Sequence, residues 1–146
     1  MRTLRDDDGT RYLLLKRSGE SSLVRDPETG EERYVRNDRL TDVDGESPLE
    51  TAAREVPPAL RRLLAAVRDD RALGLLLEVD RRGPLAVRDL MAAYDLCESD
   101  TLGLLTEFRA AGLVERADVV GEPGYDTTDD ARRALVALRE RTDDSA

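Results

Sequence analysis

The stretch LLTEFRAAGLV, from Leu104 to Val114, predicts where a helix ends and where a strand begins. Leu102, Leu105 and Phe108 keep the spacing of one apolar helical face. Gly112 can adopt the left-handed conformation that often ends a helix. We therefore expect a helix that stops sharply at Gly112, with Leu105 and Phe108 buried in the core.

A second phrase, GYDTTDDARRAL from Gly124 to Leu135, predicts the start of another helix. Thr128 can cap this helix, because a threonine side chain accepts a hydrogen bond from a free backbone N–H of the first turn. Between the two phrases, residues 113–120 and 125–127 are expected to be strands. The residues GEPG, 121–124, are expected to form the turn between them.

Four further helices are expected earlier in the chain. SPLE at residues 47–50 is typical of a capping box, and Leu60, Leu63, Leu64 and Val67 form one stripe of the next helix. Residues 70–82 are apolar almost all round, which predicts a second cover for this helix: the meander, the preceding helix or a second subunit. We expect self-association through residues 73–79. The fourth helix spans residues 87–96.

The first third of the chain predicts a three-stranded antiparallel β-meander over residues 11–17, 21–26 and 31–36. The phrase DPETG, residues 26–30, is a hairpin signal, because Pro27 presets the turn and Gly30 can take a positive φ. Such a meander is marginal alone and needs something to pack on. We expect it to be a docked appendage.

The composition excludes several kinds of site. The chain has 146 residues, one cysteine, no histidine and a net charge of −9. No internal disulfide is possible, and a zinc site would need several Cys or His ligands. No phosphate loop and no nucleophile–base pair is evident, so we expect no catalytic residues, no metal, no cofactor and no enzyme. Without an apolar run long enough to span a bilayer or an N-terminal secretory signal, no membrane contact is expected and a cytoplasmic location is predicted.

The charge is dominated by aspartate, glutamate and arginine, and Lys16 is the only lysine. This texture resembles the proteins of salt-in halophilic archaea, in which an acidic surface keeps proteins hydrated. At molar salt the Debye length is about 3 Å, so net charge then says little about DNA binding.

Residues 70–141 resemble the winged helix-turn-helix superfamily of transcription regulators, of the MarR-like and ArsR-like type. The resemblance rests on GPLAVRDL at 83–90, on LLTEFRAAGLVE at 104–115 and on GYDTTDDARRAL at 124–135, in that order. The whole chain resembles a halophilic archaeal family with a winged-helix segment. The fold class is therefore expected to be α+β, a winged helix-turn-helix domain with the N-terminal three-stranded β-meander.

This resemblance places the recognition helix at residues 99–112 and implies DNA as a partner. The positions that would enter the major groove hold small, apolar or acidic side chains, among them Ser99, Asp100 and Thr106. DNA readers commonly carry arginine, asparagine or glutamine there, because those side chains reach base edges. The candidate DNA-binding residues are Arg88, Ser99, Thr106, Arg109 and Arg116. Cys97 is expected to be a small buried residue at the start of this helix.

Three domain ranges follow: residues 1–46 as appendage and linker, residues 47–142 as helical lead-in and winged helix, and residues 143–146 as a disordered tail. The expected function is transcription regulation by direct DNA binding, as a homodimer. The alternative is an adaptor that uses the winged helix to contact another transcription regulator or the transcription machinery without binding DNA itself. Leu102, Gly103 and Leu104 would then belong to the partner surface.

Overall fold

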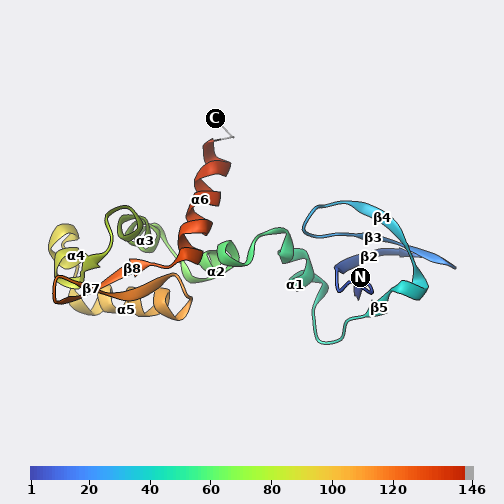
Figure 1. Cartoon of the computed structure of the whole chain (residues 1–146), viewed down its shortest axis with the longest axis horizontal. Coiled ribbons are helices and arrows are strands. Elements are labelled where there is room, and N and C mark those ends of the chain that lie inside the picture. Colours follow the sequence, from blue (N-terminus) through green and yellow to red (C-terminus); the bar gives the residue numbers. More distant parts are fainter. Residues whose placement is uncertain (144–146) are drawn as a thin grey trace. The chain divides into compact units, whose positions relative to one another are not determined.

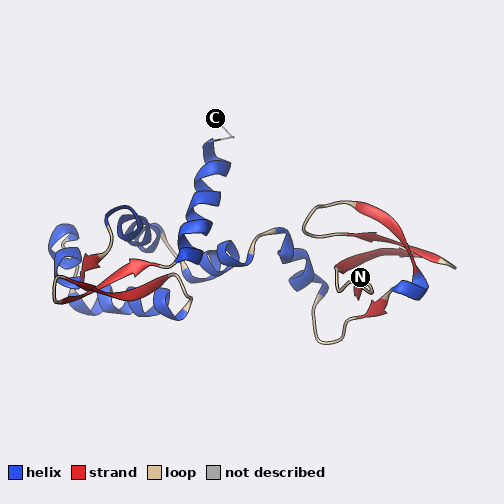
Figure 2. Ribbon diagram, in the orientation of Figure 1, coloured by secondary structure: helices blue, strands red, loops and turns tan. Residues whose placement is uncertain are grey.

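The chain forms two compact units, Met1–Pro57 and Pro58–Ala146, in the computed structural model (Figures 1 and 2). The structure describes residues 1–143. Of the expected disordered tail, Asp143 is the last residue of the final helix, and residues 144–146 lie outside the described part. No helix of the described chain is long and apolar enough to cross a membrane.

The N-terminal unit is built on a five-stranded antiparallel sheet of order β4-β3-β2-β1-β5. The predicted meander is present as β2, β3 and β4, and Gly30 closes its second hairpin with a φ of 75°. The sequence analysis missed the two further strands, because each is too short to show a pattern. The elements are β1 (Thr3–Arg5), β2 (Arg11–Arg17), β3 (Ser21–Arg25), β4 (Glu32–Arg36), the 3-10 helix η1 (Asn37–Arg39), β5 (Thr41–Asp42), α1 (Pro48–Ala52) and the 3-10 helix η2 (Ala53–Glu55).

Different groups pack on the two faces of this sheet. One face holds the core cluster of Leu4, Tyr12, Val24 and Val35. On the other face, Thr3 lies 2.6 Å from Thr51 of α1, measured between the two Oγ1 atoms. Helix α1 begins with the predicted capping box at Ser47 and Glu50, but it packs against β2. The sequence analysis had grouped this helix with the winged-helix range that starts at residue 47.

In the second unit, residues 58–143, which the structure describes, form five helices and a three-stranded antiparallel sheet of order β6-β8-β7. Figure 2 shows this alternation of helices and short strands. The elements are α2 (Pro58–Ala66), α3 (Asp70–Arg82), β6 (Leu85–Ala86), α4 (Val87–Tyr94), α5 (Glu98–Ala110), β7 (Val114–Val119), β8 (Glu122–Thr127) and α6 (Asp129–Asp143).

Helix α3 spans the predicted residues 70–82, with Asp69 as its N-cap and Gly83 as its C-cap. Its residues Ala72, Leu75, Leu76 and Val79 are buried within the unit, whereas Leu73 and Leu77 are half-buried. Most of the apolar area that suggested a second subunit is therefore covered by the chain itself. On α2, Leu60 and Leu63 are buried, but Leu64 is 60% exposed instead of continuing the stripe.

Helix α5 confirms part of the expected core stripe. Leu105 and Phe108 are fully buried, but Leu102 is 39% exposed. The third buried position is Thr101, which lies four residues before Leu105 on the same face. Its hydroxyl donates a 2.8 Å hydrogen bond to the backbone oxygen of Cys97, so the buried oxygen is satisfied. Cys97 itself is exposed, and the expectation that it is buried was wrong.

The β7–β8 hairpin, which we call the wing, has its turn one residue earlier in the chain than the predicted turn at residues 121–124. Val119 pairs with Glu122, so the turn is Val120–Gly121, and residues 122–124 belong to the returning strand. Both turn residues have positive φ, as a tight two-residue hairpin turn requires. The turn was predicted at the glycine–proline cluster, but Pro123 is tolerated within β8 because β6 pairs only with Gly124 and Tyr125, so this side of β8 has no strand partner at Pro123.

The third strand of this sheet, β6, was not predicted. Ala86 pairs with Gly124, and a Cβ atom on Gly124 would lie 2.4 Å from the backbone oxygen of Leu85. A glycine is therefore needed where these two strands meet. The two residues of β6 carry no periodic signal of their own, so only the tertiary pairing reveals the strand.

Candidate nucleic-acid interface

The outer face of α5 is formed by small and uncharged side chains. Ser99, Gly103, Thr106 and Ala110 are all exposed, and their spacing places them on the side opposite the buried Phe108. Leu102 and Arg109 lie along one flank of this face. A surface of this kind allows close approach of a partner, but it offers few groups that reach base edges.

The other flank of α5 carries two acidic residues that are paired within the unit. Asp100 lies 3.8 Å from Arg71 of α3, and Glu107 accepts a hydrogen bond from Arg68, just before α3. The hydrogen bond and the charge of Glu107 raise the pKa of the Arg68 guanidinium further above its usual value. These arginines partly offset the negative charge that the sequence places on this flank of α5.

Sequence reasoning missed this role of Arg68 and Arg71. Their partners lie some thirty to forty residues later in the chain, beyond the reach of any helical spacing rule. Because both residues stand in a run of mixed charges, RDDR at 68–71, no local signal marked them.

The candidate residue Arg88 stands in the first turn of α4 and reaches the wing. Its guanidinium lies 2.9 Å from Glu122 of β8 in an ion pair, with 74% of the Arg88 side chain exposed. Most of this guanidinium is still open to solvent. A phosphate would compete with the Glu122 carboxylate for it.

The structure places Arg116 on the opposite face of the wing from the Arg88–Glu122 pair. Arg116 is paired with Tyr125 across the strands, whereas Glu122 is paired with Val119. Side chains alternate between the two faces of a strand, so Arg116 and Val119 point to opposite sides. The two candidate residues Arg88 and Arg116 therefore flank the wing.

The remaining candidates are accessible. Arg109 lies exposed in the last turn of α5, and Ser99 and Thr106 share the outer face already described. At the tip of the wing, Val120 is 99% exposed and has a φ of 52°, which is unfavourable for a β-branched residue. The tip is thus held in a strained turn and presents an apolar side chain instead of a basic one.

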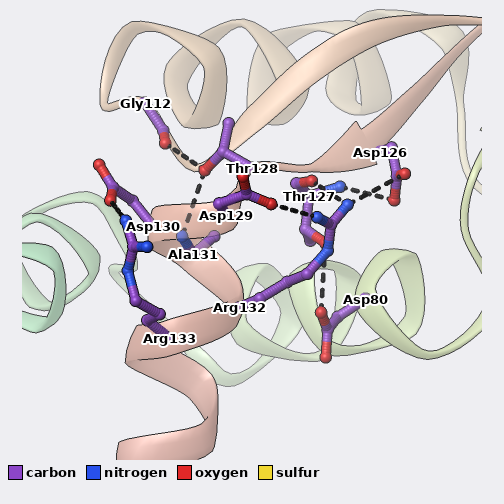
Figure 3. Close-up of polar contacts among 10 residues, drawn as sticks. All are labelled: Asp80, Gly112, Asp126, Thr127, Thr128, Asp129, Asp130, Ala131, Arg132 and Arg133. Carbon is purple, nitrogen blue, oxygen red and sulfur yellow. Dashed lines mark hydrogen bonds and ion pairs between the residues drawn. The ribbon is translucent and has the colours of Figure 1, made fainter.

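A network of polar side chains holds the wing against α3 and α6 (Figure 3). Thr127 donates a 3.2 Å hydrogen bond to Asp80 of α3, which also pairs with Arg139 at 3.1 Å. Arg132 of α6 binds Asp126 at 3.1 Å and donates a 2.6 Å hydrogen bond to the backbone oxygen of Thr127. The base of the wing is therefore fixed by contacts from two helices.

An apolar cavity of about 370 Å³ lies beside α5, among residues of α3, α4 and α5. Leu77 and Leu104 are two of the aliphatic residues that line it. At its rim, the hydroxyl of Tyr94 donates a hydrogen bond to Glu78 and accepts a 2.6 Å hydrogen bond from Arg82. No group of acidic or cysteine side chains suited to a metal ion occurs in residues 1–143.

Comparison with known proteins assigns the chain to a family. Residues 1–139 match a family of unknown function, DUF7346, and the chain belongs to this family. No curated protein matches it. Among solved structures, it is similar to a transcriptional regulator of the MarR family from Rhodococcus sp. RHA1, with 22% identity and a TM-score of 0.47 over 59% of this chain. That match spans 64% of the regulator's own length.

A second similar structure is an ArsR-like transcriptional regulator from Rhodococcus sp. RHA1. It shares 21% identity with a TM-score of 0.46, over 59% of this chain and 81% of the other. The fold class is α+β, with an N-terminal antiparallel sheet and a second unit of helices and a β-hairpin wing that resembles winged-helix regulators. The expected fold class is confirmed at this level, with five strands in the N-terminal sheet instead of three.

Proposed function

We propose that the chain is a cytoplasmic transcription regulator whose second unit binds duplex DNA through α5 and the wing. The observation that carries this proposal is the exposed outer face of α5 at Ser99, Gly103 and Thr106. Its small side chains would let the helix lie deep in a major groove. The adjacent acidic residues are already paired with Arg68 and Arg71.

Affinity in this proposal comes mainly from phosphate contacts, because the outer face has few base-directed groups. Arg88, Arg109 and Arg116 are the proposed phosphate ligands, and Ser99 and Thr106 are the proposed groove contacts. Since Arg88 and Arg116 lie on opposite faces of the wing, they would reach different stretches of the DNA backbone. Their effects on binding should then be additive.

The test measures binding of labelled duplexes of several sequences to the folded chain over a range of potassium chloride concentrations. Arg88→Gln, Arg109→Gln and Arg116→Gln should each weaken binding similarly for every duplex. Each should also flatten the dependence of log K on log salt by about 0.9 per lost phosphate contact. Arg133→Gln is the matched control, since Arg133 is equally exposed but lies on α6 beside Asp130.

The alternative function is that of an adaptor, and the apolar cavity beside α5 favours it. Leu104 lines this cavity, and Leu102 is partly exposed on the same helix. A partner protein could insert an apolar side chain there. If the folded wild-type chain binds no duplex even at low salt, the adaptor takes the place of the DNA-binding proposal.

We also propose that the chain acts as a homodimer. This state is expected because α3 has more apolar residues than one core-facing side can bury. Since Leu73 and Leu77 of α3 are only half-buried, they remain available to a second subunit. Sedimentation velocity over a range of protein concentrations tests this. A monomer at every concentration would remove the dimer from the proposal.

A further inference from the structure

The meander strands of the N-terminal sheet concentrate positive charge in an acidic protein. The chain has a net charge of −9, yet β2, β3 and β4 contain only one acidic residue, Glu32. The basic residues of these strands are Arg11, Lys16 and Arg17 in β2, Arg25 in β3, and Arg33 and Arg36 in β4. The acidic residues of this region otherwise lie in the turns between the strands.

Two of these arginines are occupied by contacts inside the unit. Arg11 forms an ion pair with Glu46 at 2.7 Å. Arg33 donates a hydrogen bond to the hydroxyl of the buried Tyr12 and lies over its ring, 5.4 Å from the centroid. The other four basic side chains are exposed or half-buried, and of these Arg36 pairs with Asp38.

The strand register divides these four between the two faces of the sheet. Lys16 is opposite Leu23, which is opposite Tyr34, so the three side chains form one row across the sheet. Arg17 is opposite the buried Ser22 and therefore lies on the other face. We define the Tyr34 face as Lys16, Ser21, Leu23, Arg25, Tyr34 and Arg36, which share one side by this register.

Helix α1 covers only the other end of this side of the sheet. It sits over Thr3, and Leu13, which is paired with Thr3, is 1% exposed. Tyr34 is 63% exposed, and Lys16 and Arg36 are also exposed. Arg36 pairs with Asp38 at 3.0 Å but keeps 73% of its side chain accessible. Tyr34 is therefore open, with Arg36 in the next row on one side, the Arg25–Glu32 pair in the next row on the other side, and Lys16 beyond Leu23 in its own row.

We infer that the Tyr34 face binds single-stranded nucleic acid, with an unpaired base stacked on Tyr34 and the phosphates held by Lys16, Arg25 and Arg36. Open sheet faces that combine an aromatic ring with basic side chains suit single strands, because every base has a π-face that can stack. Bases of a duplex are already stacked on one another and cannot use the ring. Glu32, opposite Arg25, limits the positive surface on that side.

This inference is independent of the proposed function, since it uses residues of the other unit. It concerns a different form of nucleic acid from the duplex proposed for α5 and the wing. The two proposals can therefore fail separately. The variants that test one leave the residues of the other unchanged.

The experiment measures fluorescence anisotropy of labelled oligothymidylate and oligouridylate of about 20 nucleotides, a length chosen to exceed the roughly 4–16 nucleotides of a small single-strand site. The full chain is used, in a series of potassium chloride concentrations. Tyr34→Leu should weaken binding about tenfold, because a stacked base is lost. Tyr34→Phe, which keeps the aromatic ring, should bind as the wild type does. Tighter binding of one oligonucleotide identifies DNA or RNA as the preferred strand.

A matched pair of adjacent residues tests the assignment of the face. Lys16→Gln should weaken binding and flatten the salt dependence by about 0.7, the slope expected for one phosphate contact on a single strand. Arg17→Gln removes the same charge from the opposite face and should leave binding unchanged. Circular dichroism shows whether each variant is folded.

Three results of these measurements would overturn the inference, and a fourth comes from a cross-check. These are a wild-type chain that binds neither oligonucleotide, a folded Tyr34→Leu variant with unaltered affinity, or equal losses in Lys16→Gln and Arg17→Gln. The triple variant Arg88→Gln, Arg109→Gln, Arg116→Gln serves as the cross-check. It should lose duplex binding and retain the oligonucleotides, and loss of both would assign the single strand to the winged-helix unit instead.

Discussion

The hydroxyl of Thr128 donates a 2.6 Å hydrogen bond to the backbone oxygen of Gly112 (Figure 3). The hydroxyl oxygen of Thr128 in turn accepts a 3.2 Å hydrogen bond from the backbone N–H of Ala131, in the first turn of α6. One side chain therefore caps α6 and also binds the residue that follows the end of α5. The two phrases that predicted these boundaries in the sequence meet in the structure.

Replacement of Thr128 by alanine should lower the free energy of unfolding by about 1–2 kcal/mol, because the cap and the bond to Gly112 are both lost. Thr128→Ser keeps the hydroxyl and should stay close to the wild type. Urea unfolding followed by circular dichroism measures both. An unchanged midpoint in Thr128→Ala would show that the side chain does not cap α6.

A pair of substitutions in α5 checks which residues face the core. Phe108→Ala should cost about 3–5 kcal/mol, since a fully buried aromatic side chain leaves a cavity. Leu102→Ala should lower the free energy of unfolding by much less than Phe108→Ala does, because Leu102 is partly exposed. The comparison uses unfolding midpoints of the two variants. Equal losses would mean that the helix is rotated from the orientation described.

Two glycines should respond in opposite directions to substitution by alanine. At Gly124 a Cβ atom would lie 2.4 Å from the backbone oxygen of Leu85, so Gly124→Ala should separate β6 from β8 and destabilise the second unit. Gly103 lies in the exposed face of α5 with open space around it, and Gly103→Ala should stabilise by about 0.5–1 kcal/mol. Thermal unfolding of the two variants gives the sign of each effect.

Stability should depend on pH through Glu46. Burial would raise the pKa of this carboxyl, but the hydrogen bond and charge of Arg54, with hydrogen bonds from Thr51 and Arg11, lower it below its usual value. A lowered folded-state pKa gives stability that is present above the unfolded pKa and lost as pH falls through the folded pKa. Glu46→Gln should therefore cost about 1–3 kcal/mol at neutral pH.

The same substitution should matter little in acid. The wild type loses the Glu46 contribution as the pH falls below about 4, whereas the glutamine variant has none to lose. Melting curves of both proteins at several pH values measure the difference. Glu50→Gln serves as the control, since Glu50 is exposed and bonds only the backbone N–H of Ser47. If the difference in melting temperature between the wild type and Glu46→Gln stays constant as the pH falls into the acidic range, the role of Glu46 is contradicted.

Local chemistry was enough to predict the main elements. The capping residues Ser47, Asp69 and Thr128 and the terminating Gly112 act within a few residues of themselves, so their signals can be read in the sequence. The same holds for the apolar spacing of Leu105 and Phe108. The DPETG hairpin was also predicted correctly, because turn preferences are a property of four or five adjacent residues.

Features that depend on distant residues were decided only by the tertiary structure. Strands β1, β5 and β6 exist because their neighbours pair with them, and each is three residues or fewer. Thr101 takes the core position expected of Leu102, because a hydrogen bond to Cys97 makes its burial acceptable. Burial of Cys97 was wrongly expected, since apolar character alone does not tell which side of a helix start faces the core.

The candidate sites show the same division. Sequence alone marked Ser99, Thr106, Arg88, Arg109 and Arg116 as exposed residues near the recognition helix and wing, and all five are at the surface. Only the strand register separated Arg88 and Arg116 onto opposite faces, and only long-range ion pairs showed that Arg68 and Arg71 offset the acidic flank of α5. Charge and helical periodicity are local properties of the sequence, whereas the pairing of charges depends on which elements pack against one another.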